Sequence, residues 1–209
     1  MERVKIAVSP EIQVGGSLFT PEQFALVGSL AEAGASIEMT PFGQLYIELA
    51  ADRLDDIRSE LQRAELQVLP AGFATKGLIA CHFCKGAEEA GLEVARELNR
   101  SIAGVSTPTP VKVGYAGCAL GTSEPLLKDI GVVKMRDTFD IYVGGQPKGL
   151  KVAFALPLMS GVESAQVGPA VRSIVDYYAA NAKGKEKFRK FVERVSLDTL
   201  REQVRETFQ

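Results

Sequence analysis

Residues 20–34, TPEQFALVGSLAEAG, decide the fold of the first part of the chain. Thr20 followed by Pro21 and Gln23 is typical of a helix start, because Thr20 can cap the helix and Gln23 can reach back to the capping residue. Apolar residues then recur at helical spacing: Phe24, Val27, Leu30 and Ala31. Gly34 is a natural stop, so we expect one amphipathic helix here.

The segments on both sides of this helix complete a small α/β unit. Residues 4–8 are a short β-type run, and residues 36–49 form two strand-like pieces around a proline and a glycine. Residues 52–65 carry one apolar stripe on a charged helix, and residues 67–69 can return as a strand. The order strand, helix, strand, helix, strand is that of a ferredoxin-like α/β sandwich.

Residues 70–77, PAGFATKG, have the composition of a linker. We therefore expect two units, residues 1–72 and residues 73–209. In the second unit we expect a helix at 86–99, strands at 111–117, 130–134, 139–143 and 150–156, and helices from 166 onward. The basic run KGKEKFRKF within the last part is interpreted first as a solvated helix face and second as a partner surface.

The composition narrows the class of protein. The chain has 209 residues, of which 46% are hydrophobic, so it can bury a core. A formal charge of −2 with scattered Lys and Arg gives no footprint for nucleic acid. No apolar stretch is long enough for a membrane span, and the start lacks the apolar core of a signal peptide. We expect a cytoplasmic protein that binds neither nucleic acid nor membrane.

Three cysteines are the residues with the most evident chemistry. Cys81 and Cys84 flank His82 and Phe83, directly before the expected helix at 86–99, whose N-terminus would favour a thiolate at Cys84. A C-x-x-C pair alone fits a redox pair, a zinc site, an iron–sulfur site or simple packing. His82 is interpreted as a local hydrogen-bonding group rather than a ligand.

Cys118 adds to this pair because it follows a predicted strand among small residues, which allow a large group to approach the backbone. Three thiolates from two such turns could hold most of an iron–sulfur cube. Packing of three incidental cysteines and a zinc-stabilised α/β module are the alternatives.

Three segments resemble the siroheme and [4Fe-4S] nitrite and sulfite reductases. They are GGSLFTPEQFALVGSLAEAGASIEMTPFGQLYIEL at 15–49, GYAGCALGTSEPLLKDIGVVKMRDTFDIYVGG at 114–145 and YYAANAKGKEKFRKFVERV at 177–195. The first resembles the ferredoxin-like half-domain of that family. The second is similar to its G-C-P-N-x-C cluster motif with the closing Y-V-G-G, and the third is similar to its C-terminal helix. The resemblance implies a ferredoxin-like half-domain followed by an α/β cluster-and-siroheme domain.

The resemblance also implies cofactor ligands, with departures. Cys81, Cys84 and Cys118 would bind a [4Fe-4S] cluster, although the family's first pair is usually C-x5-C. Thr122 stands where the family has the cysteine shared between cluster and siroheme, so the usual bridge is absent. Gly43 stands roughly where the half-domain usually offers an arginine to the tetrapyrrole.

Siroheme carries eight carboxylates, so its site needs cationic side chains. The candidates for cofactor binding, besides Thr122, are Lys76, Lys85, Lys112 and Lys134, and the candidates for catalysis are Lys112 and Arg136. Each of these cations could equally be ordinary surface charge. In an active enzyme they would bind the anion and deliver protons.

Two functions follow from the resemblance. The first is an oxidoreductase that reduces nitrite or sulfite with a cluster and siroheme, a haem-type cofactor. The second is a non-catalytic cluster- or tetrapyrrole-binding protein for electron transfer, sensing or cofactor handling. No flavin or dinucleotide motif is visible, so electrons would come from an external donor such as a ferredoxin. A single half-domain suggests a homodimer or an accessory partner.

Overall fold

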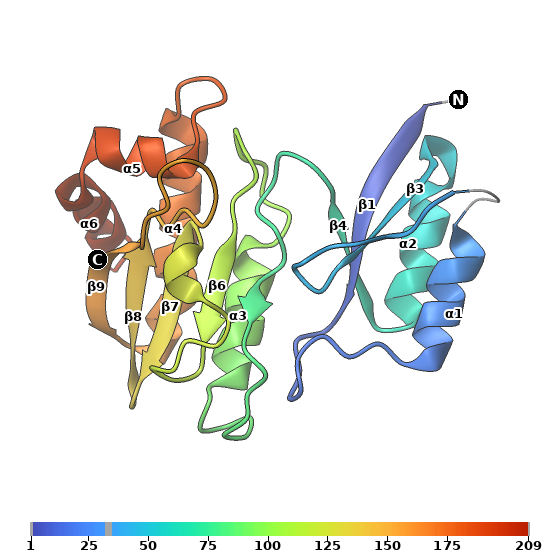
Figure 1. Ribbon diagram of the computed structural model, residues 1–209, viewed down its shortest axis with the longest axis horizontal. Coiled ribbons are helices and arrows are strands. Elements are labelled where there is room, and N and C mark those ends of the chain that lie inside the picture. The colour runs from blue at the N-terminus through green and yellow to red at the C-terminus, as the bar shows by residue number, and fades with distance from the viewer. Residues whose placement is uncertain (1, 32–34, 209) are drawn as a thin grey trace.

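The computed structural model describes residues 2–31 and 35–208, and its helices and strands form two neighbouring α/β units (Figure 1). The elements of the first unit are β1 (Arg3–Pro10), α1 (Pro21–Leu30), β2 (Glu38–Met39), β3 (Leu45–Ala50), the 3-10 turn η1 (Ala51–Arg53), α2 (Leu54–Arg63) and β4 (Leu66–Pro70). Its strands form an antiparallel sheet in the order β2-β3-β1-β4. This is the predicted ferredoxin-like arrangement.

Helix α1 begins as the sequence predicts. The Thr20 side chain accepts from the Gln23 amide at 3.2 Å, and the Gln23 side chain accepts from the Thr20 amide at 3.0 Å. Val27 and Leu30 are buried against the sheet, whereas Phe24 is 47% exposed. The helix is capped at Ala31, and the predicted stop at Gly34 lies outside the described residues.

The second unit follows in sequence. Its elements are β5 (Ile79–Ala80), α3 (Leu92–Ile102), β6 (Val113–Ala116), the 3-10 turn η2 (Pro125–Leu127), β7 (Ile130–Met135), β8 (Thr138–Val143), β9 (Leu156–Val162), α4 (Ser164–Asn181), α5 (Phe188–Val195) and α6 (Leu197–Glu206). The sheet has the order β5-β6-β7-β8-β9. Strands β5, β6 and β7 are parallel, and the last two pairs are antiparallel. The carboxyl ends of β5, β6 and β7 therefore share one edge.

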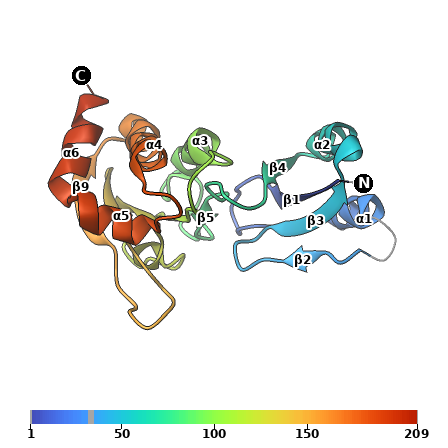
Figure 2. The same cartoon turned by 90° about the horizontal axis from the view of Figure 1, so that it is seen from above.

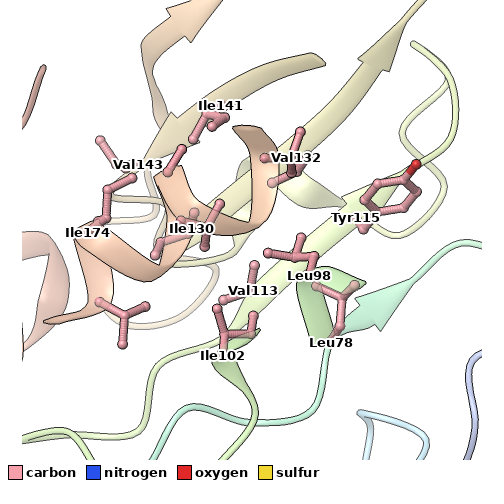
Figure 3. Close-up of a cluster of buried hydrophobic side chains, with 14 of the residues drawn as sticks. Leu78, Leu98, Ile102, Val113, Tyr115, Ile130, Val132, Ile141, Val143 and Ile174 are labelled. Atoms are coloured by element: carbon pink, nitrogen blue, oxygen red, sulfur yellow. The ribbon is translucent and has the colours of Figure 1, made fainter. Parts of the chain in front are cut away.

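A large apolar core joins this second sheet to its helices (Figure 3). Strand residues Val113, Ile130 and Val132 are buried under helix residues Leu98 and Ile174. Figure 2 shows α3 and α4 on one side of the sheet, while the loop between β8 and β9 projects on the other side. Burial of such side chains contributes about 1.5–3 kcal/mol each, so this core fixes the parallel strands.

The predicted start of one helix and the predicted position of one strand were wrong. The helix expected at 86–99 begins only at Leu92, because Gly86 (φ 93°) and Gly91 (φ 69°) adopt left-handed conformations that interrupt a right-handed helix. The strand expected at 150–156 is mostly an exposed loop, held by a single bridge between Gln146 and Ala153, and the strand itself is β9. Among the described residues no strand pairs with this loop, and its alternating apolar residues are exposed.

The expected linker is also more ordered than its composition suggests. Residues 74–78 are all buried. The amides of Thr75 and Lys76 donate to the carbonyls of Val105 and Val111 at 2.8 and 2.9 Å. This segment is therefore hydrogen-bonded to the second unit, and we propose that the boundary between the two units lies between residues 72 and 73.

Candidate functional site

Two of the three cysteines follow neighbouring parallel strands. Cys81 comes directly after β5, and its amide donates to the Tyr115 carbonyl of β6 at 3.0 Å. Cys118 comes two residues after β6. Because β5 and β6 run parallel with Ala80 opposite Tyr115, both cysteines lie at the same edge of the sheet.

A backbone contact brings the two turns together. The Gly117 amide donates to the Cys81 sulfur at 3.3 Å, and Cys81 is only 8% exposed. A Cβ atom on Gly117 would come within 2.6 Å of the Cβ atom and carbonyl oxygen of Ala90. Only glycine therefore permits this close approach, which places an N–H donor beside the Cys81 sulfur.

The turn between Cys81 and Cys84 is anchored by Phe83. Phe83 has φ 52°, an uncommon conformation for a bulky residue, yet its side chain is 1% exposed. Its ring stacks on that of Tyr115 with centroids 5.9 Å apart. Burial of Phe83 thus fixes the turn while Cys84 stays exposed at the surface.

Tyr115 is a site residue that the sequence interpretation missed. It is fully buried, and its hydroxyl lies 2.8 Å from the Ala90 carbonyl and 2.9 Å from the Gly91 carbonyl, to which it can donate. Burial raises the pKa of Tyr115, so it remains a neutral donor. The signal in the sequence was a single large residue among the small ones of VGYAG, which can pack under a turn.

Lys85 lies near the other two thiols. Its ammonium donates to Glu89 at 3.1 Å, and this bond raises the pKa of Lys85, with smaller contributions from the charges of Cys118 and Cys84. Cys118 is half-buried and Cys84 is exposed, while Thr122 is also exposed. The structure therefore brings all three cysteines to one end of the sheet.

The three thiols agree in number and kind with three positions of an iron–sulfur cube, and they come from turns after adjacent parallel strands. The N–H donor on the Cys81 sulfur is the kind of contact that favours a thiolate. Among residues 2–31 and 35–208, no three His, Cys, Asp or Glu side chains are arranged to hold a single metal ion. The three cysteines lie at one end of the sheet, but within this range they do not form a ready-made metal site.

His82 contributes to packing of this edge. Its backbone carbonyl accepts from the Gly15 amide at 2.9 Å. Its ring lies so close to Gly16 that a Cβ atom there would come within 2.5 Å of the ring. The loop before α1 thus covers the cysteine turn, and His82 has a local structural part in that contact.

The predicted cationic residues divide into two groups. Lys85, Lys134 and Arg136 lie at the cysteine end of the parallel strands, and the Lys134 ammonium donates to the Arg136 carbonyl in the turn after β7. Lys76 and Lys112 lie before β5 and β6, at the other end. Lys112 and Arg136 are separated by roughly 20 Å, the length of a six-residue strand at about 3.3 Å per residue. The structure does not bring these two candidate catalytic residues together.

Lys76 and Lys112 lie close together where the two units meet. Lys76 is 5% exposed, and its ammonium donates to the Gly72 carbonyl at 2.9 Å and lies 5.7 Å from the centre of the Tyr46 ring. The Lys112 ammonium lies 5.2 Å from the centre of the Phe42 ring. Burial lowers the pKa of Lys76, and the charge of Lys112 lowers it further. Within the described chain neither ammonium has a carboxylate ion pair, so this junction can accept an anion.

A family model for the nitrite and sulphite reductase 4Fe-4S domain matches residues 74–209, which include all three cysteines. The chain belongs to this family. Its relatives include a cobalt-factor III methyltransferase of Priestia megaterium, 27% identical over 91% of this chain and 35% of that protein. An assimilatory-type sulfite reductase of Nitratidesulfovibrio vulgaris is 25% identical over 72% of this chain and 67% of that protein.

An assimilatory ferredoxin-dependent nitrite reductase of Haloferax mediterranei is 28% identical over 76% of this chain, but this chain covers 29% of it. This chain thus spans about a third of two of these three relatives.

Solved structures agree with the fold. The structure of the Mycobacterium tuberculosis NirA protein matches 94% of this chain and 39% of that chain with a TM-score of 0.58 and 25% identity. Dissimilatory sulfite reductase I matches 97% of this chain and 69% of that chain with a TM-score of 0.74, and its 12% identity makes it a likeness of fold alone. In the residues that the structure describes, no helix has the length and apolar character needed to cross a membrane.

Proposed function

We propose that this member of the nitrite and sulfite reductase family binds a [4Fe-4S] cluster through Cys81, Cys84 and Cys118 and a siroheme-type tetrapyrrole beside it. The observation that carries the proposal is the placement of Cys81 and Cys118 after adjacent parallel strands, with the Gly117 amide on the Cys81 sulfur. Thr122, which lies in the loop after Cys118, occupies the place of the family's bridging cysteine. The fourth iron ligand would then be Thr122, water or another group.

The cluster and tetrapyrrole, when bound, supply the electrons and the redox chemistry. The chain's own cations then have two tasks. Lys85, Lys134 and Arg136 lie at the cysteine end, where they suit the carboxylates of a tetrapyrrole. Lys76 and Lys112 lie at the other end of these strands, so we propose that the tetrapyrrole extends to the junction of the two units, where their ammonium groups suit a small oxyanion such as nitrite or sulfite.

Lys76 is the better proton donor of this pair. Its burial and the charge of Lys112 both lower the pKa of Lys76, so it releases a proton more readily than a solvated lysine. Lys112 keeps its ammonium on the Phe42 ring and can hold the anion in place. An external donor such as a ferredoxin would supply the electrons, and we place the protein in the cytoplasm.

A second function is favoured by one specific observation. The relative that matches 91% of this chain is named a cobalt-factor III methyltransferase rather than a reductase. Together with the absent bridging cysteine, this match supports a cluster- or tetrapyrrole-binding unit in cofactor handling, without anion reduction. In either case we propose that a homodimer or an accessory partner completes the tetrapyrrole pocket.

The two functions are separated by one assay on anaerobically prepared holoprotein. Reduction of nitrite or sulfite with a chemically reduced donor supports the reductase, and Lys112→Gln should then lower the rate with the iron content unchanged. Bound cluster or tetrapyrrole without reduction of either anion supports cofactor handling. The mass of the loaded protein in solution tests the dimer, which a monomer would contradict.

A further inference from the structure

A cavity of about 500 Å³ lies at the amino ends of β6 and β7, away from the cysteines. Its cationic lining residues are Lys112, Lys148, Lys185, Lys187 and Arg189. One carboxylate, that of Asp129, faces them in this cavity. The chain as a whole carries a net charge of −2, so this concentration of positive charge is local.

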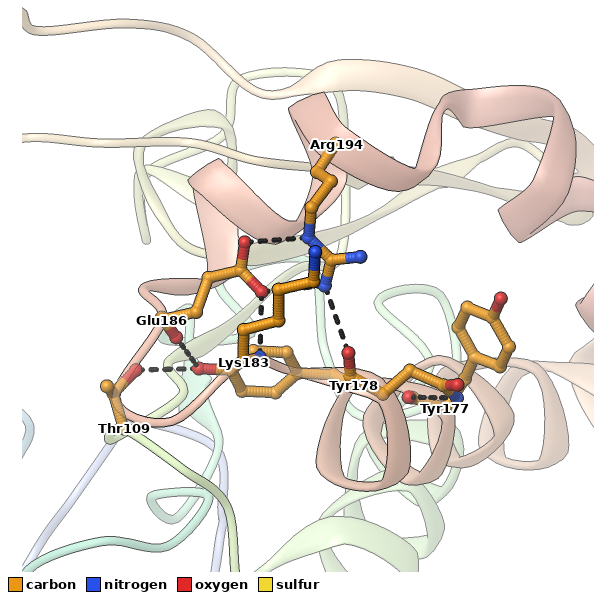
Figure 4. A network of polar contacts seen from close by, with 7 residues as sticks. Thr109, Tyr177, Tyr178, Lys183, Glu186 and Arg194 are labelled. Carbon is orange, nitrogen blue, oxygen red and sulfur yellow. Dashed lines mark hydrogen bonds and ion pairs between the residues drawn. The ribbon is translucent and has the colours of Figure 1, made fainter.

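The loop that supplies two of these lysines is held rigidly (Figure 4). The Tyr178 hydroxyl lies 2.8 Å from the Thr109 hydroxyl and donates to the Glu186 carbonyl. The Glu186 carboxylate accepts two bonds from Arg194, at 2.9 and 2.7 Å. The residues on both sides of Glu186 therefore have a fixed backbone.

Two of the cations are also positioned by aromatic rings. The Lys112 ammonium lies 5.2 Å from the centre of the Phe42 ring, and the Lys185 ammonium lies 5.2 Å from the centre of the Phe73 ring. Arg189 is already engaged, because it pairs with Glu193 at 2.9 Å. Cations placed in this way lose little side-chain entropy when an anion binds.

Helix α5 begins at the same cavity. Its N-cap is Lys187, which makes no side-chain capping bond, and its first two residues, Phe188 and Arg189, line the cavity. The first turn contains no acidic residue. The free amides of this turn and the helix dipole add to the attraction that the lysines exert on an anion.

We propose that this cavity binds a compact polyanion that carries two or more phosphate or carboxylate groups. Its volume suits a small molecule. The inference shares Lys112 with the proposed function but goes beyond it, because it needs neither cluster nor tetrapyrrole and lies at the opposite end of β6 from Cys118. It also gives the basic run at 183–191 a binding task in addition to its place on a helix.

The test is calorimetric titration of the holoprotein with pyrophosphate and, separately, with citrate at physiological salt. The cavity variant is Lys148→Gln with Lys187→Gln. In the described chain neither of these lysines forms an ion pair. The matched control is Lys183→Gln with Lys190→Gln, which removes the same charge from the same region without touching the cavity lining.

We expect at least one of the two anions to bind the wild type, and whichever binds more tightly identifies the phosphate or carboxylate source. The cavity variant should weaken binding about tenfold or more, the control less than about twofold, and both should keep wild-type iron and sulfide contents. Three results would overturn the proposal: binding of neither anion, equal weakening in both variants, or loss of iron from the cavity variant. The last would assign these lysines to the cofactor site.

Discussion

The Gly117 amide donates a hydrogen bond to the sulfur of Cys81, and through it the turn after β6 is fixed to the turn after β5. The bond depends on close backbone packing, because Gly117 lies against Ala90 with no room for a side chain. The stacked rings of Phe83 and Tyr115 support the turn after β5. Packing and this hydrogen bond thus hold the two turns of the cysteine edge together.

Gly117→Ala should disturb this edge. The added methyl group would meet the Cβ atom and carbonyl of Ala90, and we expect a loss of about 1–3 kcal/mol in the free energy of unfolding together with a lower iron content. Urea denaturation and iron analysis measure both. Gly28→Ala is the control, since it lies in α1 with nothing within 4 Å, and it should be neutral or stabilising. Equal stabilities of the two variants would contradict the packing argument.

Tyr115→Phe should destabilise the protein without changing its shape. The change removes the only hydroxyl that reaches the Ala90 and Gly91 carbonyls in the described structure, and leaving these acceptors without it costs about 1–3 kcal/mol. Chemical denaturation gives the difference. Tyr177→Phe is the matched control, because its hydroxyl makes no hydrogen bond within the described residues, and a similar loss there would rule out the specific role of Tyr115.

Arg194→Gln should alter the acid stability of the protein. The hydrogen bond from Arg194 lowers the pKa of Glu186 to about 2 from an ordinary value of 4.5. A carboxylate with a lowered pKa stabilises the fold above about pH 4.5, and this contribution is lost as pH falls toward 2. The stability difference between wild type and variant should therefore shrink across that range. Arg205→Gln, which removes a surface arginine that forms no ion pair with any other described residue, should give a difference that does not change with pH.

Asp129→Asn should show the opposite dependence. Burial raises the pKa of Asp129 to about 6 from 3.8, although the Lys112 amide donates to its carboxylate at 2.9 Å. A carboxyl group with a raised pKa costs stability as it ionises in the fold, so the wild type should lose stability relative to the variant as pH rises from about 4 to 6. Denaturation curves at several pH values measure this, and parallel profiles would contradict the buried, protonated state.

Local signals in the sequence predicted much of the fold. The capping box at Thr20 and the helical spacing that buries Ile174 and Tyr178 are properties of neighbouring residues, and both are confirmed. The start of α3 was wrong because left-handed glycines at 86 and 91 depend on contacts with distant residues, such as the Tyr115 hydroxyl.

The candidate site was predictable only in part. Cys81 and Cys118 were singled out from spacing and resemblance, and parallel pairing of β5 and β6 explains why they meet. The proximity of buried Lys76 to half-buried Lys112 was not predictable, because it arises where the two units pack and leaves no pattern along the chain. Gly117 was missed as a supporting residue because its contact with Ala90 joins segments far apart in the sequence, whereas Tyr115 had a local signal as the one large residue in VGYAG.

The most direct test of the central claim is the visible spectrum of anaerobically purified protein, with iron and acid-labile sulfide counted on the same sample. We predict broad iron–sulfur absorption with roughly four iron and four sulfide per chain, and sharp tetrapyrrole bands where siroheme is bound. Cys81→Ser, Cys84→Ser and Cys118→Ser should each lose the cluster, and Cys84→Ser is the cleanest variant because its side chain is exposed. Iron-free wild-type protein from a cluster-competent anaerobic host, or full iron and sulfide in all three variants, would contradict the assignment.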